Sequence, residues 1–156
     1  MTPVKTIASN RKAYHDFFVQ DELEAGVVLT GTEIKSVREG RVNLRDSYVQ
    51  IRGRQAWVVN VHIAPYSAGS RENPNPRRER KLLLHRKEIV RLQSAVQEKG
   101  LTIVPLRMYL KDNWAKLEIA LARGKKLYDK RAQMADRETQ RLVQQELKAR
   151  RSPVED

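Results

Sequence analysis

The stretch LTIVPLRMYLKDNWAKLEIALA, residues 101–122, gives the strongest indication of how this chain folds. Two segments rich in apolar and β-branched residues, 101–110 and 114–122, flank the turn-forming residues Lys111-Asp112-Asn113. Residue character alternates in the second segment, with Leu117, Ile119 and Leu121 on one face and Lys116 and Glu118 on the other. This pattern predicts an antiparallel hairpin with one face on a core and the other toward solvent.

The residues before this hairpin predict more short strands and two helices. We expect strands at 13–20 and 23–29, a hairpin that pairs 48–52 with 57–63, an exposed loop at 66–79 and an apolar strand at 81–84. Thr30 followed by Glu33 is a capping-box pattern and Gly40 can end a helix, so a short helix is expected at 30–40. Apolar residues at helical spacing predict a second helix at 86–99, ended by Gly100. About six strands and two short helices in about 120 residues indicate a mainly β fold, a small closed antiparallel barrel.

The carboxyl-terminal part of the chain has a different composition. We expect a body, residues 1–123, and a tail, residues 124–156, in which Gly and Pro are absent from 125 to 152. Five basic residues of the tail fall on one stripe of a helical wheel: Lys126, Lys130, Arg137, Arg141 and Lys148. Its apolar residues scatter around the wheel, so no face can pack on the barrel. The tail is either a solvated helix or a segment that is largely unstructured in solution and folds along an RNA groove.

The charge of the chain points to a nucleic-acid partner. Lys and Arg number 31 against 19 Asp and Glu, so the net charge is +12 and the pI about 10.2. The excess is concentrated at 71–91, at 32–54 and in the tail. A basic chain with clustered Arg is typical of a phosphate-binding surface. No window is apolar enough to span a membrane and residues 1–10 lack a signal-peptide core, so we expect a cytoplasmic protein that binds no membrane.

Few residues are available for catalysis. The chain has no cysteine, and its three histidines, at 15, 62 and 85, do not have the spacing of metal ligands. Gly124-Lys125-Lys126 is not a P-loop, because Ile119 stands where the first glycine is required. We therefore expect no enzyme activity, no metal and no cofactor. A metal-dependent nuclease built from paired acids is a remote alternative, since no spacing selects a pair.

Features suited to binding RNA are more numerous. The run Arg77-Arg78-Glu79-Arg80-Lys81 follows a Pro-containing loop and precedes an apolar strand, where forked guanidinium groups can bind phosphates. Tyr14, His15 and Tyr128 lie beside basic residues and can stack on an unpaired base, although Tyr14 fits a half-buried core position equally well. These features alone fit a general structured-RNA-binding protein, such as a ribosomal-protein-like or RNA-chaperone barrel.

Seven motifs match a known family in order and spacing. They are Asn10-Arg11-Lys12-Ala13-Tyr14-His15-Asp16, Glu24-Ala25-Gly26, Gly31-Thr32-Glu33-Ile34-Lys35-Ser36, Asp46-Ser47-Tyr48, Arg80-Lys81-Leu82-Leu83-Leu84-His85, Val104-Pro105-Leu106 and Gly124-Lys125-Lys126-Leu127-Tyr128-Asp129-Lys130-Arg131. On these residues the chain resembles the SmpB family, the bacterial SsrA-binding proteins, over residues 7–137. Beyond Arg137 the match is in composition only, and the loop 67–75 is variable in that family.

The resemblance implies an oligonucleotide-binding (OB-fold) antiparallel barrel with short flanking helices. Such a barrel would bind the tRNA-like domain of transfer-messenger RNA (tmRNA, or SsrA RNA) and deliver it to the vacant A site of a stalled ribosome for trans-translation. No bond would be made or broken by the protein. The tail would become helical on the ribosome and occupy the decoding centre and the empty mRNA channel of the small subunit. Elongation factor EF-Tu would join through the aminoacylated tmRNA, and the protein would act as a monomer.

The resemblance also implies two sets of site residues. Matching positions would bind tmRNA through Asn10, Arg11, Lys12, His15, Glu24, Lys35, Arg80, Lys81, Leu83 and His85. Matching positions in the tail would bind the ribosome through Gly124, Lys125, Lys126, Tyr128, Asp129, Lys130 and Arg131. Family members have His or Tyr at the position of Tyr128, so a flat ring is the expected requirement there. Glu24 is unusual because phosphate repels a carboxylate, so we expect it to accept from a base N–H or to hold a neighbouring Arg, unless it is only a turn residue before Gly26.

Overall fold

The computed structural model describes residues 4–66, 73–125, 135 and 137–145 of the chain. Contacts within the chain divide it into two compact units, Met1–Gly124 and Lys125–Asp156. We call the first unit the body and the second the tail. In this division Gly124, the last residue of a strand, belongs to the first unit.

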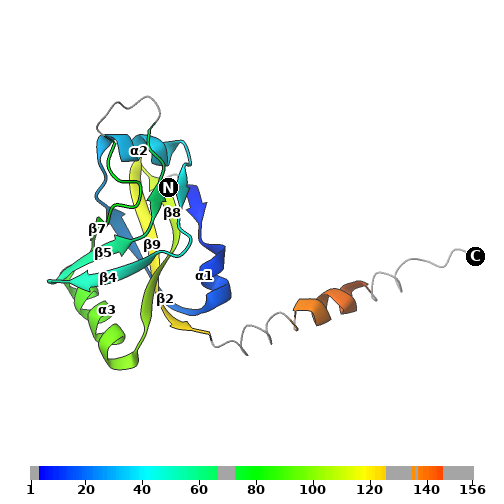
Figure 1. Cartoon of the computed structure of the whole chain (residues 1–156). Helices are drawn as coiled ribbons and strands as arrows, with labels where there is room; N and C mark the ends of the chain where they lie inside the picture. The colour runs from blue at the N-terminus through cyan, green and yellow to red at the C-terminus, as the bar shows by residue number, and fades with distance from the viewer. Residues whose placement is uncertain (1–3, 67–72, 126–134, 136, 146–156) are drawn as a thin grey trace, which may run out of the picture. The chain divides into compact units, whose positions relative to one another are not determined.

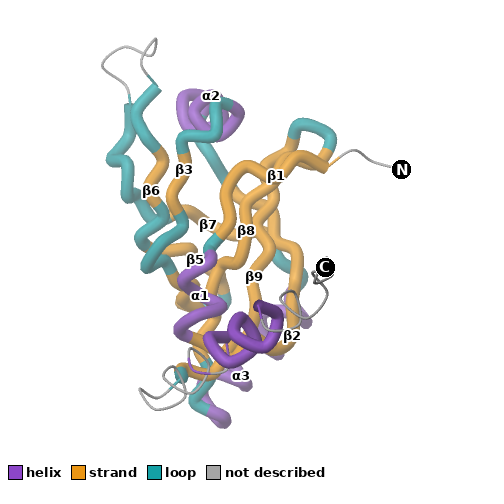
Figure 2. Tube along the Cα trace, turned by 90° about the vertical axis from the view of Figure 1, so that its right-hand side faces the viewer, coloured by secondary structure: helices purple, strands orange, loops and turns teal. Residues whose placement is uncertain are grey.

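The body contains short strands and three helices among its described residues. The strands are β1 (Val4–Ser9), β2 (Phe17–Val27), β3 (Val42–Asn43), β4 (Tyr48–Arg52), β5 (Gln55–Val59), β6 (His62–Ile63), β7 (Arg80–Leu83), β8 (Thr102–Lys111) and β9 (Trp114–Gly124). The helices are α1 (Arg11–Asp16), α2 (Gly31–Arg38) and α3 (Arg86–Lys99). Figure 1 shows α2 at one end of the strands and α3 at the other, and Figure 2 shows the same arrangement after a quarter turn.

The main sheet closes on itself. Its strand order among the described residues is β1-β8-β4-β5-β7-β2-β9, with all neighbours antiparallel, and a further pairing between β8 and β9 completes a barrel. Strands β3 and β6 form a separate small pair. The predicted fold class is confirmed, since the body is mainly β with short helices and its closed antiparallel sheet is compatible with an OB-fold.

Local sequence signals account for several of these elements. Asp112 and Asn113 both have positive φ, 51° and 64°, and Lys111 pairs with Trp114. The predicted hairpin of β8 and β9 is therefore present, but its turn has two residues, because Lys111, which was expected in the turn, is the last residue of β8. The capping box of α2 is present, with Thr30 Oγ1 accepting from the Glu33 amide at 3.2 Å and Glu33 Oε1 accepting from the Thr30 amide at 2.9 Å. Helix α3 has the predicted bounds and ends at Gly100, whose φ is +64°.

The prediction of two strands at 13–20 and 23–29 is correct only in part, because residues 17–27 form a strand but residues 13–16 do not. Asn10 caps a helix, α1, by accepting a hydrogen bond from the Ala13 amide at 3.3 Å, so residues 11–16 are helical. A single strand, β2, then runs through both predicted segments, with a register shift between Val19 and Glu22. The charged residues in its middle are exposed and mark this irregularity rather than a turn. The prediction also missed β1, which pairs with the end of β8.

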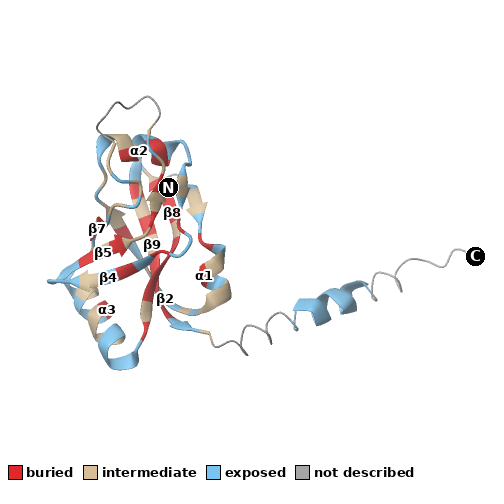
Figure 3. Cartoon of the chain, viewed as in Figure 1, coloured by how far each residue is buried: buried red, intermediate tan, exposed pale blue. Residues whose placement is uncertain are grey.

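The body has two apolar cores, one on each face of β8 and β9. The larger fills the barrel and includes Ala25, Val58, Leu82, Ile103 and Leu117. The smaller consists of Ala13, Val104, Leu106, Ala120 and Ala122. Neighbouring residues of a strand face opposite sides, so the smaller core lies outside the barrel, beneath α1. Figure 3 shows the buried residues along these strands.

The tail is described at residues 125, 135 and 137–145. Residues 137–145 are helical and exposed, including Leu142 and Val143. The rest of the tail lies outside the described residues. Across the part of the chain that the structure describes, none of the helices combines the length and the apolar character needed to cross a membrane.

Candidate RNA interface

Four of the residues predicted to bind RNA line one groove of the body. Glu24 from β2, Lys81 and Leu83 from β7, and His85 before α3 surround a space of about 540 Å³. Strand β2 pairs with β7 through Gly26 and Leu83, and with β9 through Gly26 and Lys116. Residues far apart in the sequence therefore meet here because β2 lies between β7 and β9. We call this space the RNA groove.

Two cations missed by the sequence interpretation also line the RNA groove. Arg54 projects from the turn between β4 and β5, where its φ is +63°, and Lys116 lies on β9. The alternation of polar and apolar residues predicts that Lys116 lies on the polar face of its hairpin, but nothing else in the sequence indicates that it lines a groove. Arg54 gave no signal, because its approach to β7 depends on the pairing of β5 with β7.

Glu24 is held in a fixed position at the edge of the RNA groove. Its Oε2 accepts a hydrogen bond from the Tyr109 hydroxyl and lies 3.6 Å from Lys111 Nζ, while the side chain remains 40% exposed. The Tyr109 hydrogen bond, opposed by partial burial and helped by the charges of Lys111 and Lys116, lowers the pKa of Glu24. The carboxylate is therefore ionised at neutral pH and can accept hydrogen bonds from a bound molecule.

Tyr109 belongs to a row of interacting side chains on the outer face of β8 and β9. Burial and its hydrogen bond to Glu24 raise the pKa of Tyr109, so the hydroxyl stays protonated as a donor. The Arg107 guanidinium lies 4.4 Å from the centre of the Tyr109 ring, and its Nε lies 3.1 Å from Glu118 Oε2. Glu118 is the cross-strand partner of Glu24. Arg107 therefore reduces the repulsion between two carboxylates on neighbouring strands.

Leu83 supplies an apolar edge to the same groove. Leu83 is 56% exposed, whereas Arg80 and Leu82 of the same strand are buried. A Cβ atom added to Gly26 would lie 3.3 Å from the Cβ of Leu83, so the glycine permits the close approach of these two strands. The RNA groove thus combines cations, one fixed carboxylate and an exposed aliphatic side chain.

The structure does not place Arg80 on the surface, contrary to the expectation of an RNA contact. Its side chain is 1% exposed and its Nε donates to Glu33 Oε2 at 2.7 Å. Its other nitrogens donate to the carbonyl oxygens of Val61, at 2.6 Å, and Pro76, at 3.0 Å. The cause is strand parity, because β7 begins at Arg80 and successive side chains face opposite sides, so Arg80 points inward and Lys81 outward.

Glu33 is the buried partner of two arginines. Burial raises the pKa of Glu33, but hydrogen bonds from Arg78 and Thr30 and the charge of Arg80 outweigh that effect, so the pKa lies below its ordinary value. The carboxylate is 3% exposed and forms ion pairs with both Arg78 and Arg80. This network connects α2 to β7 and thereby fixes the strand that carries Lys81 and Leu83.

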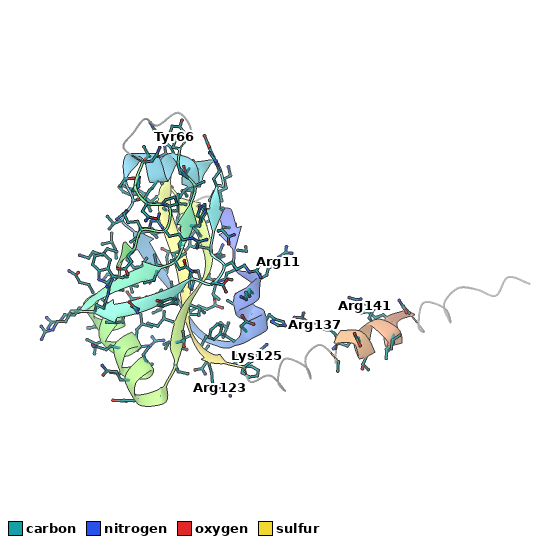
Figure 4. The ribbon with its side chains drawn as sticks, viewed as in Figure 1. Arg11, Tyr66, Arg123, Lys125, Arg137 and Arg141 are labelled. Carbon is teal, nitrogen blue, oxygen red and sulfur yellow. The ribbon has the colours of Figure 1, made fainter. Side chains whose placement is uncertain are left out.

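The predicted residues of α1 divide into buried and exposed groups. Asn10 is 5% exposed, and its Nδ2 donates to the Pro105 carbonyl at 2.8 Å, so its side chain is occupied within the body. Arg11 is exposed on the α1 flank, as Figure 4 shows. Lys12 forms an ion pair with Asp46, and His15 Nδ1 lies 3.0 Å from Asp16 Oδ1. Only the exposed members of this group can contact a large ligand directly.

The remaining predicted residues lie elsewhere. Lys35 is on α2, with its Nζ 5.3 Å from the ring centre of Tyr66, which Figure 4 shows at the α2 end. Gly124 pairs with Phe17 in the body, and Lys125 is the first residue of the tail. The other predicted tail residues lie outside the described part of the chain: Lys126, Tyr128, Asp129, Lys130 and Arg131. Within the described residues, His, Asp and Glu form no group of three that could hold a metal ion.

Comparisons with known proteins identify relatives over most of the chain. The sequence profile of the family described as SmpB protein matches residues 7–149. An SsrA-binding protein of Carboxydothermus hydrogenoformans is 54% identical over 146 residues, which cover 94% of this chain and 98% of that protein. An SsrA-binding protein of Roseiflexus castenholzii is 56% identical over 147 residues, which cover 94% of this chain and 93% of that protein.

A solved structure agrees with these sequence matches. A chain in the structure described as "tmRNA-SmpB: a journey to the center of the bacterial ribosome" is 45% identical and superposes with a TM-score of 0.65. The match covers 77% of this chain and 85% of that chain. Sequence profile, relatives and structure all point to one family, and the chain belongs to the SmpB family.

Proposed function

We propose that the body binds the tRNA-like domain of tmRNA through the RNA groove. The relatives are named SsrA-binding proteins, and the solved structure is described as containing tmRNA. The observation that carries the proposal is a fixed, ionised Glu24 beside the cations Lys81, Arg54 and Lys116. Cations supply attraction to phosphates of any RNA, whereas a carboxylate binds only where a base presents an N–H group.

The exposed members of α1 extend the proposed contact surface. Tyr14 is 48% exposed on this helix, and burial and the charges of Glu22 and Glu118 raise its pKa, so its hydroxyl stays protonated. Arg11 is exposed on the same helix. In this proposal Asn10 and Arg80 act indirectly, by positioning α1 and β7, because their polar groups are used inside the body.

We further propose that the protein is an adaptor in trans-translation, working in the cytoplasm without catalysing a reaction. It would deliver tmRNA to the vacant A site of a stalled ribosome, where the tail would occupy the decoding centre and mRNA channel of the small subunit. The basic stripe of the tail and the exposure of residues 137–145 support an RNA-lined binding site for this segment. EF-Tu would join through the aminoacylated tmRNA.

A filter-binding comparison of two RNAs tests the role of the RNA groove. Glu24→Gln should weaken binding to the tRNA-like domain by about 1.5–3 kcal/mol and leave binding to a generic duplex nearly unchanged. Lys81→Glu should weaken binding to both RNAs, because it removes a phosphate contact and adds repulsion. Glu98→Gln and Lys99→Glu, on the exposed end of α3, are the matched controls.

Two results would contradict this proposal. Equal losses on both RNAs for Glu24→Gln would show that the carboxylate has only a structural role. Unchanged affinity for Lys81→Glu, in a variant that is still folded by circular dichroism, would place the RNA on another surface of the body.

A further inference from the structure

A second groove adjoins the RNA groove at the tip of the β8–β9 hairpin. The pairing of β2 with β9 ends at Gly26 and Lys116, and the chain beyond Gly26 separates from the hairpin turn. The space between them is about 600 Å³ and is closed at one end by α2. The residues that line it come from β2 and the chain after it, from α2, from β7 and from the β8–β9 hairpin, and include Val28, Ile34, Arg38, Leu83, Asn113 and Trp114.

Large apolar side chains are exposed around this second groove. Trp114 is 72% exposed, which is unusual for the largest apolar side chain in proteins. Leu83 is 56% exposed and Val28 is 44% exposed on the opposite side of the same space. An exposed apolar cluster with polar neighbours marks a binding surface more often than a free one.

The charges around the second groove favour a nucleotide as its occupant. Arg38, exposed on α2, and Lys116 supply two cations, while Asp112 is the acid in the turn. Leu83, Gly26 and Lys116 line both grooves, so a strand of RNA in one can continue into the other. A flat ring flanked by cations is the arrangement that binds an unpaired base by stacking and its phosphate by charge.

We infer that the second groove binds one unpaired nucleotide of the RNA, with its base stacked on the indole of Trp114. This inference rests on the proposed function, because it extends the same RNA-binding surface. The phosphate of that nucleotide lies between Arg38 and Lys116, and the aliphatic side chains of Val28 and Leu83 contact the sugar and the base edge. Trp114 is therefore a specificity determinant for unpaired RNA next to the contact of Glu24.

Intrinsic fluorescence makes the inference testable, because the chain has only two tryptophans, Trp57 and Trp114. In a Trp57→Phe background, Trp114 is the sole indole, and its emission is read with excitation at wavelengths that the five tyrosines do not absorb. Addition of the tRNA-like domain of tmRNA should quench this emission, whereas an equal amount of fully paired duplex should not. Trp114→Ala should weaken binding of the tRNA-like domain about tenfold or more, and Trp114→Phe only a few-fold. Val90→Ala, an exposed apolar truncation on α3, is the control and should leave the affinity unchanged.

A second measurement identifies the partner of the ring. Each unpaired nucleotide of the tRNA-like domain is made abasic in turn, and the affinities of wild type and Trp114→Ala are compared. Removal of the stacked base should lower the affinity of wild type as much as the Trp114→Ala substitution does. The same removal should not lower the affinity of Trp114→Ala any further. Strictly additive losses at every position would overturn the inference and show that Trp114 acts only through the fold.

The two proposals fail in different ways. This inference alone would be overturned if wild type prefers the tRNA-like domain, its Trp114 emission is not quenched by that RNA, and Trp114→Ala binds the RNA with wild-type affinity. The second groove would then be assigned to a protein partner. No preference of the wild-type protein for the tRNA-like domain over duplex RNA would overturn the proposed function and this inference together.

Discussion

Replacement of Arg80 by Met should lower stability far more than RNA affinity. The substitution keeps the length of the aliphatic stem but removes a guanidinium that is 1% exposed. It leaves Glu33, 3% exposed, without its 2.7 Å partner. It also removes the guanidinium donors to the carbonyl oxygens of Val61 and Pro76, although Pro76 keeps a hydrogen bond from the Ile63 amide. The loss of one member of a buried ion pair costs about 3–5 kcal/mol.

Arg78, the remaining ion-pair partner of Glu33, determines how much unfolding free energy Arg80→Met loses within this range. Arg78 still forms an ion pair with Glu33, but its side chain is 34% exposed and its charge is partly screened. We therefore expect a loss of about 3 kcal/mol of unfolding free energy, a large part of the stability of a domain of this size. The double variant Glu33→Met, Arg80→Met removes both charges and should be more stable than Arg80→Met alone.

Urea denaturation of the full chain, followed by circular dichroism, measures these differences. A loss of about 3 kcal/mol should lower the urea midpoint by about 1–2 M. Because the pKa of Glu33 lies below its ordinary value of 4.5, the contribution of the network is fully present above pH 4.5 and is lost as pH falls through the pKa of the folded state. The difference between wild type and Arg80→Met should therefore shrink in acid.

Lys81→Met is the matched control one residue along β7. Its side chain faces the RNA groove, so it should lower RNA affinity while unfolding stays within about 0.5 kcal/mol of wild type. The affinity of Arg80→Met, measured below its urea midpoint, should stay within about threefold of wild type, or about 0.7 kcal/mol. An Arg80→Met variant that unfolds like wild type but binds RNA tenfold more weakly would refute this reasoning and restore Arg80 as a direct contact.

Three more predictions concern Tyr109, the tail and Lys81. Tyr109→Phe removes the hydrogen bond that does most to lower the pKa of Glu24. As the pH is lowered, Glu24 of this variant should become protonated, and RNA affinity should be lost, at a higher pH than in wild type. Filter-binding profiles of the two proteins that overlap between about pH 4 and 7 would contradict this prediction. Truncation after Gly124 keeps every strand of the body, so tmRNA binding should survive while peptide tagging on stalled ribosomes is lost, and loss of both would show that the tail binds tmRNA. Lys81→Glu should flatten the log-log salt dependence of binding by about 0.7–0.9 for each phosphate that the protein no longer neutralises, and an unchanged slope would show that Lys81 binds no phosphate.

Elements with strong local signals could be predicted from the sequence. The capping box at Thr30 and Glu33, Gly100 after α3, and Asp112-Asn113 between two apolar segments each fix the backbone within a few residues. The amino-terminal region could not be read this way. Its first helix begins after Asn10. The backbone N–H of Asn10 donates to the Leu106 carbonyl at 2.7 Å, and this contact joins residues about 95 positions apart, so no local pattern contains it.

The candidate site was predicted in part for the same reason. Glu24, Leu83 and His85 came from a resemblance, whereas Lys81 was also part of a basic run read from the sequence. The structure brings all four to one groove. The run of basic residues around Arg80 and Lys81 did not show which of the two side chains faces the core. That depends on the alternation of side chains along β7, which the structure defines. Tyr109 lies in an apolar strand and is only 3% exposed, so the sequence gives no reason to separate it from the core residues around it. Only the structure shows its hydrogen bond to Glu24.

The carboxylate of Glu24 has a particular use in a protein with a net charge of +12. Such a charge attracts every phosphate backbone, so attraction alone cannot separate tmRNA from the larger amount of other RNA in a cell. A carboxylate lowers this general attraction and restores it where an unpaired base offers the N–H donors of its Watson–Crick edge, since those donors are occupied in a duplex. Because Tyr109 and Lys111 already hold Glu24 in place, little side-chain entropy is lost when such a base binds. In the proposed function, specificity for a folded RNA with unpaired loops would therefore follow from one oriented acid placed among cations.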